Sequence, residues 1–244
     1  MIILIRMSIM LLFLLCVSCG KKGALIPPDI AAPPLVNALQ VVQQGENFRI
    51  AWQVPNNAAV AGFRIYRREI RSSNDECPAC GAEDLLIRMV DLEYLRDVIR
   101  DGNLFTVVDS DVQQGKTYQY QVTAYEPGGA ENRNSGRVKR TKHIPPPPPA
   151  VMLSDAPAGV MLEWAPVAVK AGTLSGYNVY RLRPGELHSV RPLNREPLHE
   201  SRYEDLRMEQ GIVYRYLVRS AARIGSETVE SDASPQVQGR FVLP

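Results

Sequence analysis

The feature that most constrains the fold is a group of three short sequence patterns that occurs twice, in the same order, along the chain. The first pattern ends in tryptophan, the second runs from glycine to Tyr-Arg, and the third contains Tyr-x-Tyr-x-Val. The first copy covers residues 48–52, 62–67 and 115–122, and the second copy covers residues 160–164, 176–181 and 211–218. The copies are offset by 112, 114 and 96 residues. This repeat predicts two equivalent folded units of about 100 residues each.

Each repeated segment alternates in character and is rich in Val, Ile, Tyr and Phe, as expected of half-buried β-strands. Clusters of turn-forming residues separate the segments at positions 55–57, 101–103 and 127–129. The apolar share of 45% and the charged share of 22% are those of a globular protein, which argues against a disordered or collagen-like chain. Together these observations predict an all-β protein built from β-sandwiches.

The order of these strands resembles that of fibronectin type III domains, with a tryptophan on the second strand and Gly-x-x-Tyr-x-Tyr-x-Val on the sixth. The resemblance implies two fibronectin type III-like (immunoglobulin-like) β-sandwiches in tandem, at residues 35–143 and 151–244. It implies that Trp52 and Trp164 fill the two cores and are not sugar-stacking platforms. It also implies that Tyr118 and Tyr214 are tyrosine-corner residues, whose hydroxyl groups bind nearby backbone.

Two proline-bearing segments are expected to act as linkers. Residues 145–149 are five consecutive prolines within a linker of residues 144–150, and such a run adopts polyproline II at about 3.1 Å per residue. We expect a stiff spacer of roughly 15 Å between the two units, although such a run could also dock in an aromatic groove of a partner. Residues 19–34 are expected to carry the lipid anchor and a tether in front of the first unit.

Residues 1–18 have the pattern of an export signal. Arg6 precedes an uncharged, apolar run at residues 7–17, which is well short of the roughly 20 residues that a spanning helix needs. Residues 15–20, Leu-Cys-Val-Ser-Cys-Gly, resemble a bacterial lipobox, although Cys16 stands where lipoboxes usually carry leucine. The resemblance implies cleavage after Ser18 and acylation of Cys19, with palmitate-like chains holding the protein at a membrane. Ordinary signal cleavage, giving a free secreted protein, is the alternative.

The residues that follow Cys19 indicate the compartment. Residues 19–28 are similar to the mature N-terminus of the small lipopolysaccharide-translocon lipoproteins, with Ala24 in place of their proline. Gly20, rather than aspartate, follows the cysteine. The resemblance therefore implies an outer-membrane lipid anchor on the periplasmic face of a Gram-negative bacterium.

The first unit carries an insertion at residues 73–102, which makes its middle part about 18 residues longer than that of the second unit. The insertion contains a Cys-x-x-Cys pair, Cys77 and Cys80, followed by Gly81 in place of the histidine that haem attachment requires. A zinc site, a thioredoxin-like redox pair and a local disulfide remain as interpretations. An oxidising periplasm favours the disulfide, so we expect neither a metal nor a cofactor.

Two further segments have alternative interpretations. Residues 84–90 are predicted to form a strand and residues 92–99 a short helix, because Leu92, Leu95 and Val98 recur at helical spacing. That helix would either cover the open side of the sandwich or dock a partner. The basic cluster at residues 137–142 would either protect a sheet edge from aggregation or meet lipid phosphates or an acidic partner.

The sequence offers no pattern that indicates catalysis, such as a nucleophile elbow, a phosphate-binding loop or a zinc-protease motif. His188 and His199 are eleven positions apart, a spacing that fits neither a strand face nor a helical turn. Residues 109–111, Asp-Ser-Asp, lack the glycine and glutamate of a calcium loop, so we interpret them as shaping a turn. A net charge of +2 does not favour a nucleic-acid partner.

These expectations describe a non-enzymatic, membrane-anchored envelope lipoprotein that binds or scaffolds through tandem fibronectin type III domains. Its partner would be an unidentified envelope protein or a polysaccharide. Three alternatives remain from the sequence: a carbohydrate-binding or cell-wall-binding accessory protein, an accessory subunit of the lipopolysaccharide translocon, and an enzyme whose site lies in the insertion.

Overall fold

The computed structural model describes residues 36–55, 60–72, 75, 83–132 and 135–242. Within these ranges the chain forms fifteen β-strands and no α-helix, which confirms the all-β prediction. Residues 36–143 are called the first half below, and residues 151–242 the second half.

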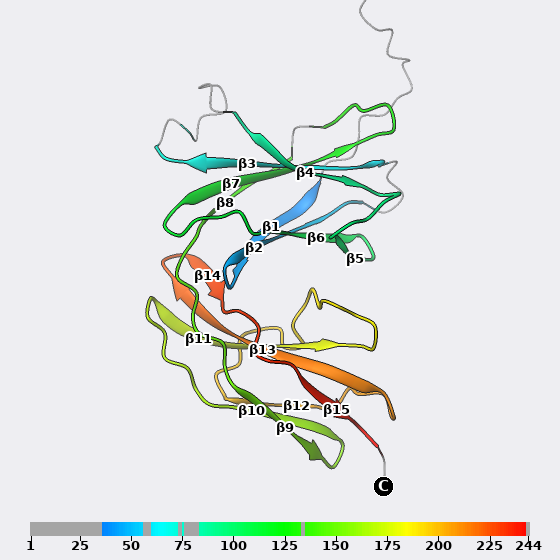
Figure 1. The fold of residues 1–244 in the computed structure, drawn as a ribbon, viewed down its shortest axis with the longest axis vertical. Coiled ribbons are helices and arrows are strands. Elements are labelled where there is room, and N and C mark those ends of the chain that lie inside the picture. Colours follow the sequence, from blue (N-terminus) through cyan, green and yellow to red (C-terminus); the bar gives the residue numbers. More distant parts are fainter. Residues whose placement is uncertain (1–35, 56–59, 73–74, 76–82, 133–134, 243–244) are drawn as a thin grey trace, which may run out of the picture. The chain divides into compact units, whose positions relative to one another are not determined.

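The first half contains two antiparallel layers of strands (Figure 1). One layer has the strand order β1-β2-β6-β5, and the other has the order β4-β3-β7-β8. Their bounds are β1 (Asn37–Gln44), β2 (Asn47–Gln53), β3 (Gly62–Ile70), β4 (Leu85–Asp91), β5 (Ile99–Asp101), β6 (Leu104–Asp109), β7 (Thr117–Tyr125) and β8 (Arg137–Thr141). Strand β4 confirms the strand that was predicted at residues 84–90.

The two layers of the first half pack face to face around an aromatic core. Trp52 on β2 is fully buried, and its ring lies 5.2 Å from that of Phe63 on β3 and 5.9 Å from that of Phe105 on β6. Phe48 on β2 meets the ring of Tyr120 on β7 edge to face at 5.9 Å. Side chains alternate along each strand, so every second residue reaches this core. The arrangement is compatible with a β-sandwich.

The second half repeats this plan with fewer strands. The layer β12-β10-β9 faces a layer in which β11 pairs with β13, and β14 and β15 pair with successive parts of β13. The bounds are β9 (Val151–Ala156), β10 (Gly159–Trp164), β11 (Thr173–Leu182), β12 (Arg202–Asp205), β13 (Val213–Ile224), β14 (Glu227–Glu230) and β15 (Val237–Arg240). Trp164 and Tyr177 meet at 5.3 Å in its core.

A short parallel pairing joins the two halves. Strand β1 pairs with β14, so that one sheet runs in the order β11-β13-β14-β1-β2-β6-β5. The buried carboxylate of Glu230 accepts hydrogen bonds from Gln44 Nε2 at 2.6 Å and from the Tyr180 hydroxyl at 2.9 Å. In addition, the backbone N–H of Thr141 donates to Glu227 at 3.2 Å. Directional polar contacts therefore set how the halves meet.

Gly45, at the turn between β1 and β2, is essential to this junction. It has φ of 58°, and its N–H donates to the carbonyl oxygen of Glu230 at 2.9 Å. A side chain there would place its Cβ 1.7 Å from Oδ1 of Asp232. Only glycine fits without displacement, because it needs neither the space nor a negative φ.

The proline run lies along the second half rather than holding the two halves apart. The carbonyl oxygen of Pro147 accepts a hydrogen bond from the Ser220 hydroxyl at 2.7 Å. Because β1 and β14 pair directly, the spacer expected at residues 144–150 does not separate the units, and residues 33–244 belong to one structural unit.

The helix predicted at residues 92–99 is wrong. Turns and bends connect β4 to β5 there, and Asp97 has φ of 53°, which an α-helix does not accommodate. The Asp91 carboxylate accepts the N–H of Glu93 at 2.8 Å, and the Asp91 carbonyl accepts the N–H of Tyr94 at 3.2 Å. These bonds favour a turn over a helix, and pairing of Ile99 with Thr106 on β6 then extends the chain.

The first prediction concerns Trp164 and the junction. We expect Trp164→Ala to lower the free energy of unfolding by about 3–5 kcal/mol, because it leaves a cavity in a packed aromatic core. The chain has two tryptophans, so the fluorescence of Trp52 then reports on the first half alone. Because β14 pairs with β1, we expect the urea midpoint reported by Trp52 to fall as well.

Met152→Ala provides the control, because Met152 lies in the same half but is 71% exposed, and it should shift stability by less than about 0.5 kcal/mol. An unchanged Trp52 transition in Trp164→Ala would show that the halves unfold independently.

Candidate functional site

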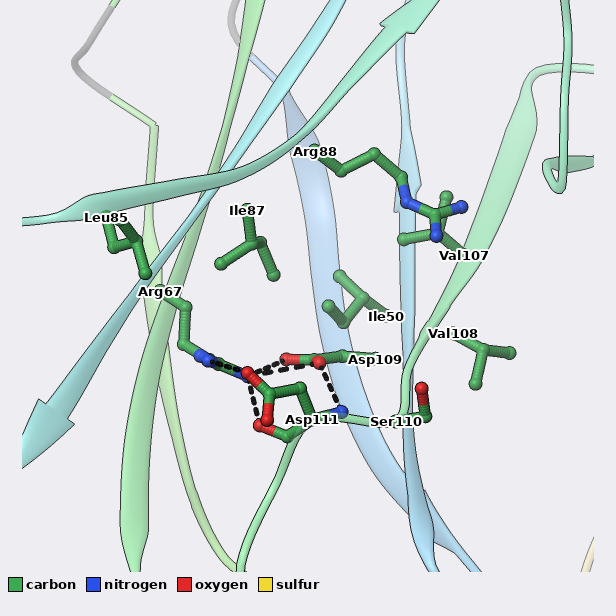
Figure 2. A pocket seen from close by; sticks show the side chains of 10 residues that line it. All are labelled: Ile50, Arg67, Leu85, Ile87, Arg88, Val107, Val108, Asp109, Ser110 and Asp111. Carbon is green, nitrogen blue, oxygen red and sulfur yellow. Dashed lines mark hydrogen bonds and ion pairs between the residues drawn. The ribbon is translucent and has the colours of Figure 1, made fainter.

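A buried charge network connects the two layers of the first half at one side of the core (Figure 2). Arg67 on β3 donates from Nη1 to Oδ2 of Asp109, at the end of β6, over 3.0 Å. The hydroxyl of Tyr120 on β7 donates to the same oxygen over 2.8 Å. Arg67 also donates from Nη2 to the Asp111 carboxylate at 2.8 Å. One guanidinium therefore serves two carboxylates.

The same network recurs in the second half. Arg181 on β11 donates to Asp205 at 2.8 Å, and the Tyr216 hydroxyl donates to Asp205 at 2.8 Å. The offsets from Arg67, Asp109 and Tyr120 are 114, 96 and 96 residues, which match the sequence repeat. Because the same contacts occur at equivalent positions of both halves, we interpret them as structural: they hold the two layers of each half together.

The network shifts the protonation of its members. Burial raises the pKa of the Tyr120 hydroxyl, and the charge of Asp109 adds to this; burial and Asp205 raise the pKa of Tyr216 in the same way. Burial by itself lowers the pKa of Arg67. The hydrogen bond to Asp111 and the charge of Asp109 outweigh this effect, so the pKa of Arg67 is raised. The hydrogen bond from Arg67 lowers the pKa of Asp111. The two tyrosines are thus held neutral, and Arg67 and Asp111 are held charged.

The structural residues expected from the sequence line the two cores. The Tyr118 hydroxyl accepts a hydrogen bond from the N–H of Gln113 at 3.0 Å, and the Tyr214 hydroxyl accepts one from Glu209 at 3.4 Å. Trp52 and Trp164 are both buried. The turn expected at residues 109–111 is present, because the Asp109 carboxylate accepts the N–H of Asp111. The buried bonds from Arg67 and Tyr120 to Asp109 have no signal in the sequence pattern.

A cavity of about 360 Å³ lies beside the network in the first half, between β4 in one layer and β2 and β6 in the other. Its apolar lining comes mainly from Ile50, Ile87 and Val107. Figure 2 shows Arg88 extending from β4 towards Val107. Its Nη1 donates to the backbone oxygen of Asp97 at 3.2 Å, and no carboxylate in the described part of the chain pairs with it. This combination of an apolar lining with one available cation suits an amphipathic anionic ligand.

The strand above the cavity is the edge of its sheet. The order β4-β3-β7-β8 leaves one side of β4 without a neighbouring strand among the described residues. Three of its apolar side chains are exposed: Leu85 by 60%, Leu86 by 46% and Met89 by 59%. Leu85 lines the cavity, whereas Leu86 and Met89 lie opposite Tyr66 and Arg64 on the other face of the sheet. Residues 85–91 are called the β4 edge below.

The structure does not place any other described residue that the sequence singled out as a candidate site at the β4 edge. Cys19, Cys77 and Cys80 lie outside the described residues. His188 and His199 are exposed in the connection between β11 and β12. Within the described ranges, no group of three or more His, Cys, Asp or Glu side chains is placed to hold a metal ion.

No protein-family model matches this sequence, and no curated protein shows significant similarity to it. In the part of the chain that the structure describes, no helix has the length and apolar character needed to cross a membrane.

The second prediction separates the two carboxylates that share Arg67. Asp109→Ala should lower the free energy of unfolding by about 3 kcal/mol, because it leaves the buried Tyr120 hydroxyl without its acceptor and the largely buried Arg67 with Asp111 as its remaining partner. Asp111→Ala should cost much less, because the Asp111 side chain is 85% exposed. Urea unfolding of both variants measures the difference, and equal losses would contradict a buried structural role for Asp109.

The third prediction concerns alkaline pH. Burial raises the pKa of Tyr120, Tyr180 and Tyr216 above the ordinary 10.0, so the folded state keeps protons that the unfolded chain releases. Stability should therefore fall as pH rises above about 10. At least three of the ten tyrosines should ionise only together with unfolding, followed by tyrosinate absorbance and circular dichroism.

Tyr120→Phe should remove one tyrosine from the phase that accompanies unfolding. Reversible ionisation of all ten tyrosines in the folded protein would contradict this account of their burial.

Proposed function

We propose that this protein is an acylated envelope lipoprotein whose two tandem fibronectin type III domains bind or scaffold without catalysing a reaction. The strand order supports the domain assignment. In immunoglobulin-like sandwiches of seven strands, the first, second, fourth and fifth strands form one sheet and the third, sixth and seventh form the other. The layers β1-β2-β6 and β3-β7-β8, and then β9-β10-β12 and β11-β13-β15, fit this division, with β4 as an added edge strand.

The β4 edge is the observation that carries the binding role. Apolar side chains on a sheet edge above an open cavity mark an interaction surface, because exposing them to water is unfavourable unless a partner covers them. The carboxylates beside it, Asp109 and Asp111, are tied to Arg67, which serves packing rather than chemistry. This distribution supports a binding module over an enzyme.

A protein partner fits this surface better than a polysaccharide. Carbohydrate recognition relies on exposed aromatic rings that stack on sugars. Among the described residues, Tyr94, at 73% exposure, is the one aromatic side chain in the group of exposed large hydrophobic residues. The remaining members of that group are aliphatic side chains, which suit contacts with protein.

The anchor rests on Cys19 and gives the fourth prediction. We expect mass spectrometry of the mature N-terminus to show diacylglyceryl-cysteine at Cys19, with the protein in the outer-membrane fraction. Cys19→Ala should leave an uncleaved precursor or a protein released from the membrane, because lipid chains supply the attachment. An unmodified Cys19 in the mature protein would reject the lipoprotein assignment. Ser18→Ala keeps a small residue before the cysteine and serves as the matched control.

A further inference from the structure

We propose that the β4 edge accepts one extended strand of a partner protein, whose apolar side chains enter the cavity between β4 and the strands β2 and β6, and whose carboxylate pairs with Arg88. The inference rests on the proposed binding function and names the class of partner for the same site.

The backbone of β4 determines that the ligand is a strand. Strand β4 pairs with β3 from Gly62 to Arg67, and in the described part of the chain no strand lies along its other side. Backbone N–H and C=O groups on such an edge act as a template for a further strand. An extended polypeptide satisfies these groups in register, which a compact ligand does not.

The exposed side chains of β4 differ from those that usually protect a sheet edge, which indicates that a partner covers this edge. The opposite edge of the same sheet, β8, carries Arg137, Lys139 and Arg140, the cationic protection that edge strands commonly have. The β4 edge instead presents Leu85 and Met89, both more than half exposed. The one irregularity in the pairing of β4 with β3 is a bulge at Ile87, which has no partner residue on β3.

The cavity specifies the side chains of the added strand. Alternate residues of that strand would point towards Ile50, Ile87 and Val107, so they should be apolar. Arg67 is already engaged by Asp109 and Asp111, whereas Arg88 donates only to a backbone oxygen within the described residues. A ligand that places one carboxylate beside Arg88 supplies a counter-ion for this guanidinium, whereas a cation at the same position meets its like charge.

A second copy of β4 does not meet this requirement. Arg88 lies opposite Ile65, on the face that lines the cavity, together with Leu85. The carboxylate of Asp84, just before β4, is bound to Arg68 at 2.9 Å and to Arg137 at 2.9 Å. The one carboxylate within β4 itself, that of Asp91, does not line the cavity. A second β4 would therefore place another arginine, and no carboxylate of its own strand, on the cavity side.

The experiment uses the full chain, purified in detergent, and three acetylated and amidated eight-residue peptides. The first alternates Val and Thr, with one Asp in the Val row; the second has Lys at that position; the third has Pro at its centre. We expect the Asp peptide to bind about tenfold more tightly than the Lys peptide, and the Pro peptide not to bind. Hydrogen exchange should slow at residues 85–91 on binding and stay unchanged at β8.

Two variants and a control locate the site. Arg88→Glu should reverse the preference between the Asp and Lys peptides, and Leu85→Lys should weaken both. Leu187→Lys changes a leucine that is 76% exposed in the second half, so it should alter neither affinity.

Equal affinity for the Asp and Lys peptides, or no binding of either at millimolar concentration, would overturn the proposal. Self-association of the full chain that Leu85→Lys abolishes would also overturn it, because a second copy would then occupy the edge. None of these outcomes changes the acylation of Cys19, so failure of the strand site is distinguishable from failure of the lipoprotein assignment.

Discussion

Asp109 in the first half and Asp205 in the second each accept hydrogen bonds from an arginine and a tyrosine that lie on the facing sheet. A carboxylate buried to this degree is costly unless it is paired and fully hydrogen-bonded. The pairing therefore holds the end of one strand at a fixed place relative to two strands of the other layer. In the first half, Arg67 and Asp109 also line the cavity beside β4, so the candidate site depends on this pairing.

The two halves share this network but differ at their edges. The first half has the additional strand β4, whose apolar side chains and Arg88 overhang the cavity. In the described residues of the second half, no named strand pairs beyond β11; an isolated antiparallel bridge between Tyr177 and Leu198 lies there instead. The arginine–aspartate–tyrosine network is common to both halves, whereas the β4 edge occurs in the first half. Functional sites are commonly added to a stable fold in this way.

A set of polar contacts joins the halves at the pairing of β1 with β14. Glu230 is 4% exposed and accepts hydrogen bonds from Gln44, Asn178 and Tyr180, while Gly45 brings the turn after β1 close enough to bind the β14 backbone. Hydrogen bonds are directional, and leaving one buried partner unsatisfied is unfavourable. The junction is therefore specific in geometry and sensitive to single substitutions at these positions.

The sequence by itself determined the local elements: the period-two alternation and the turn residues predicted the strands that became β2, β3, β7, β10, β11 and β13, because strand formation depends on nearby side chains. The same local reasoning failed at residues 92–99, where turn hydrogen bonds and pairing of β5 with β6 outweigh helical spacing. Only the tertiary structure decided the rest. Arg67 meets Asp109 across 42 residues and Gln44 meets Glu230 across 186, and no periodicity along the chain encodes contacts at such separations. The exposed β4 edge is likewise a property of the assembled sheet, because a strand is an edge only once its neighbours are in place.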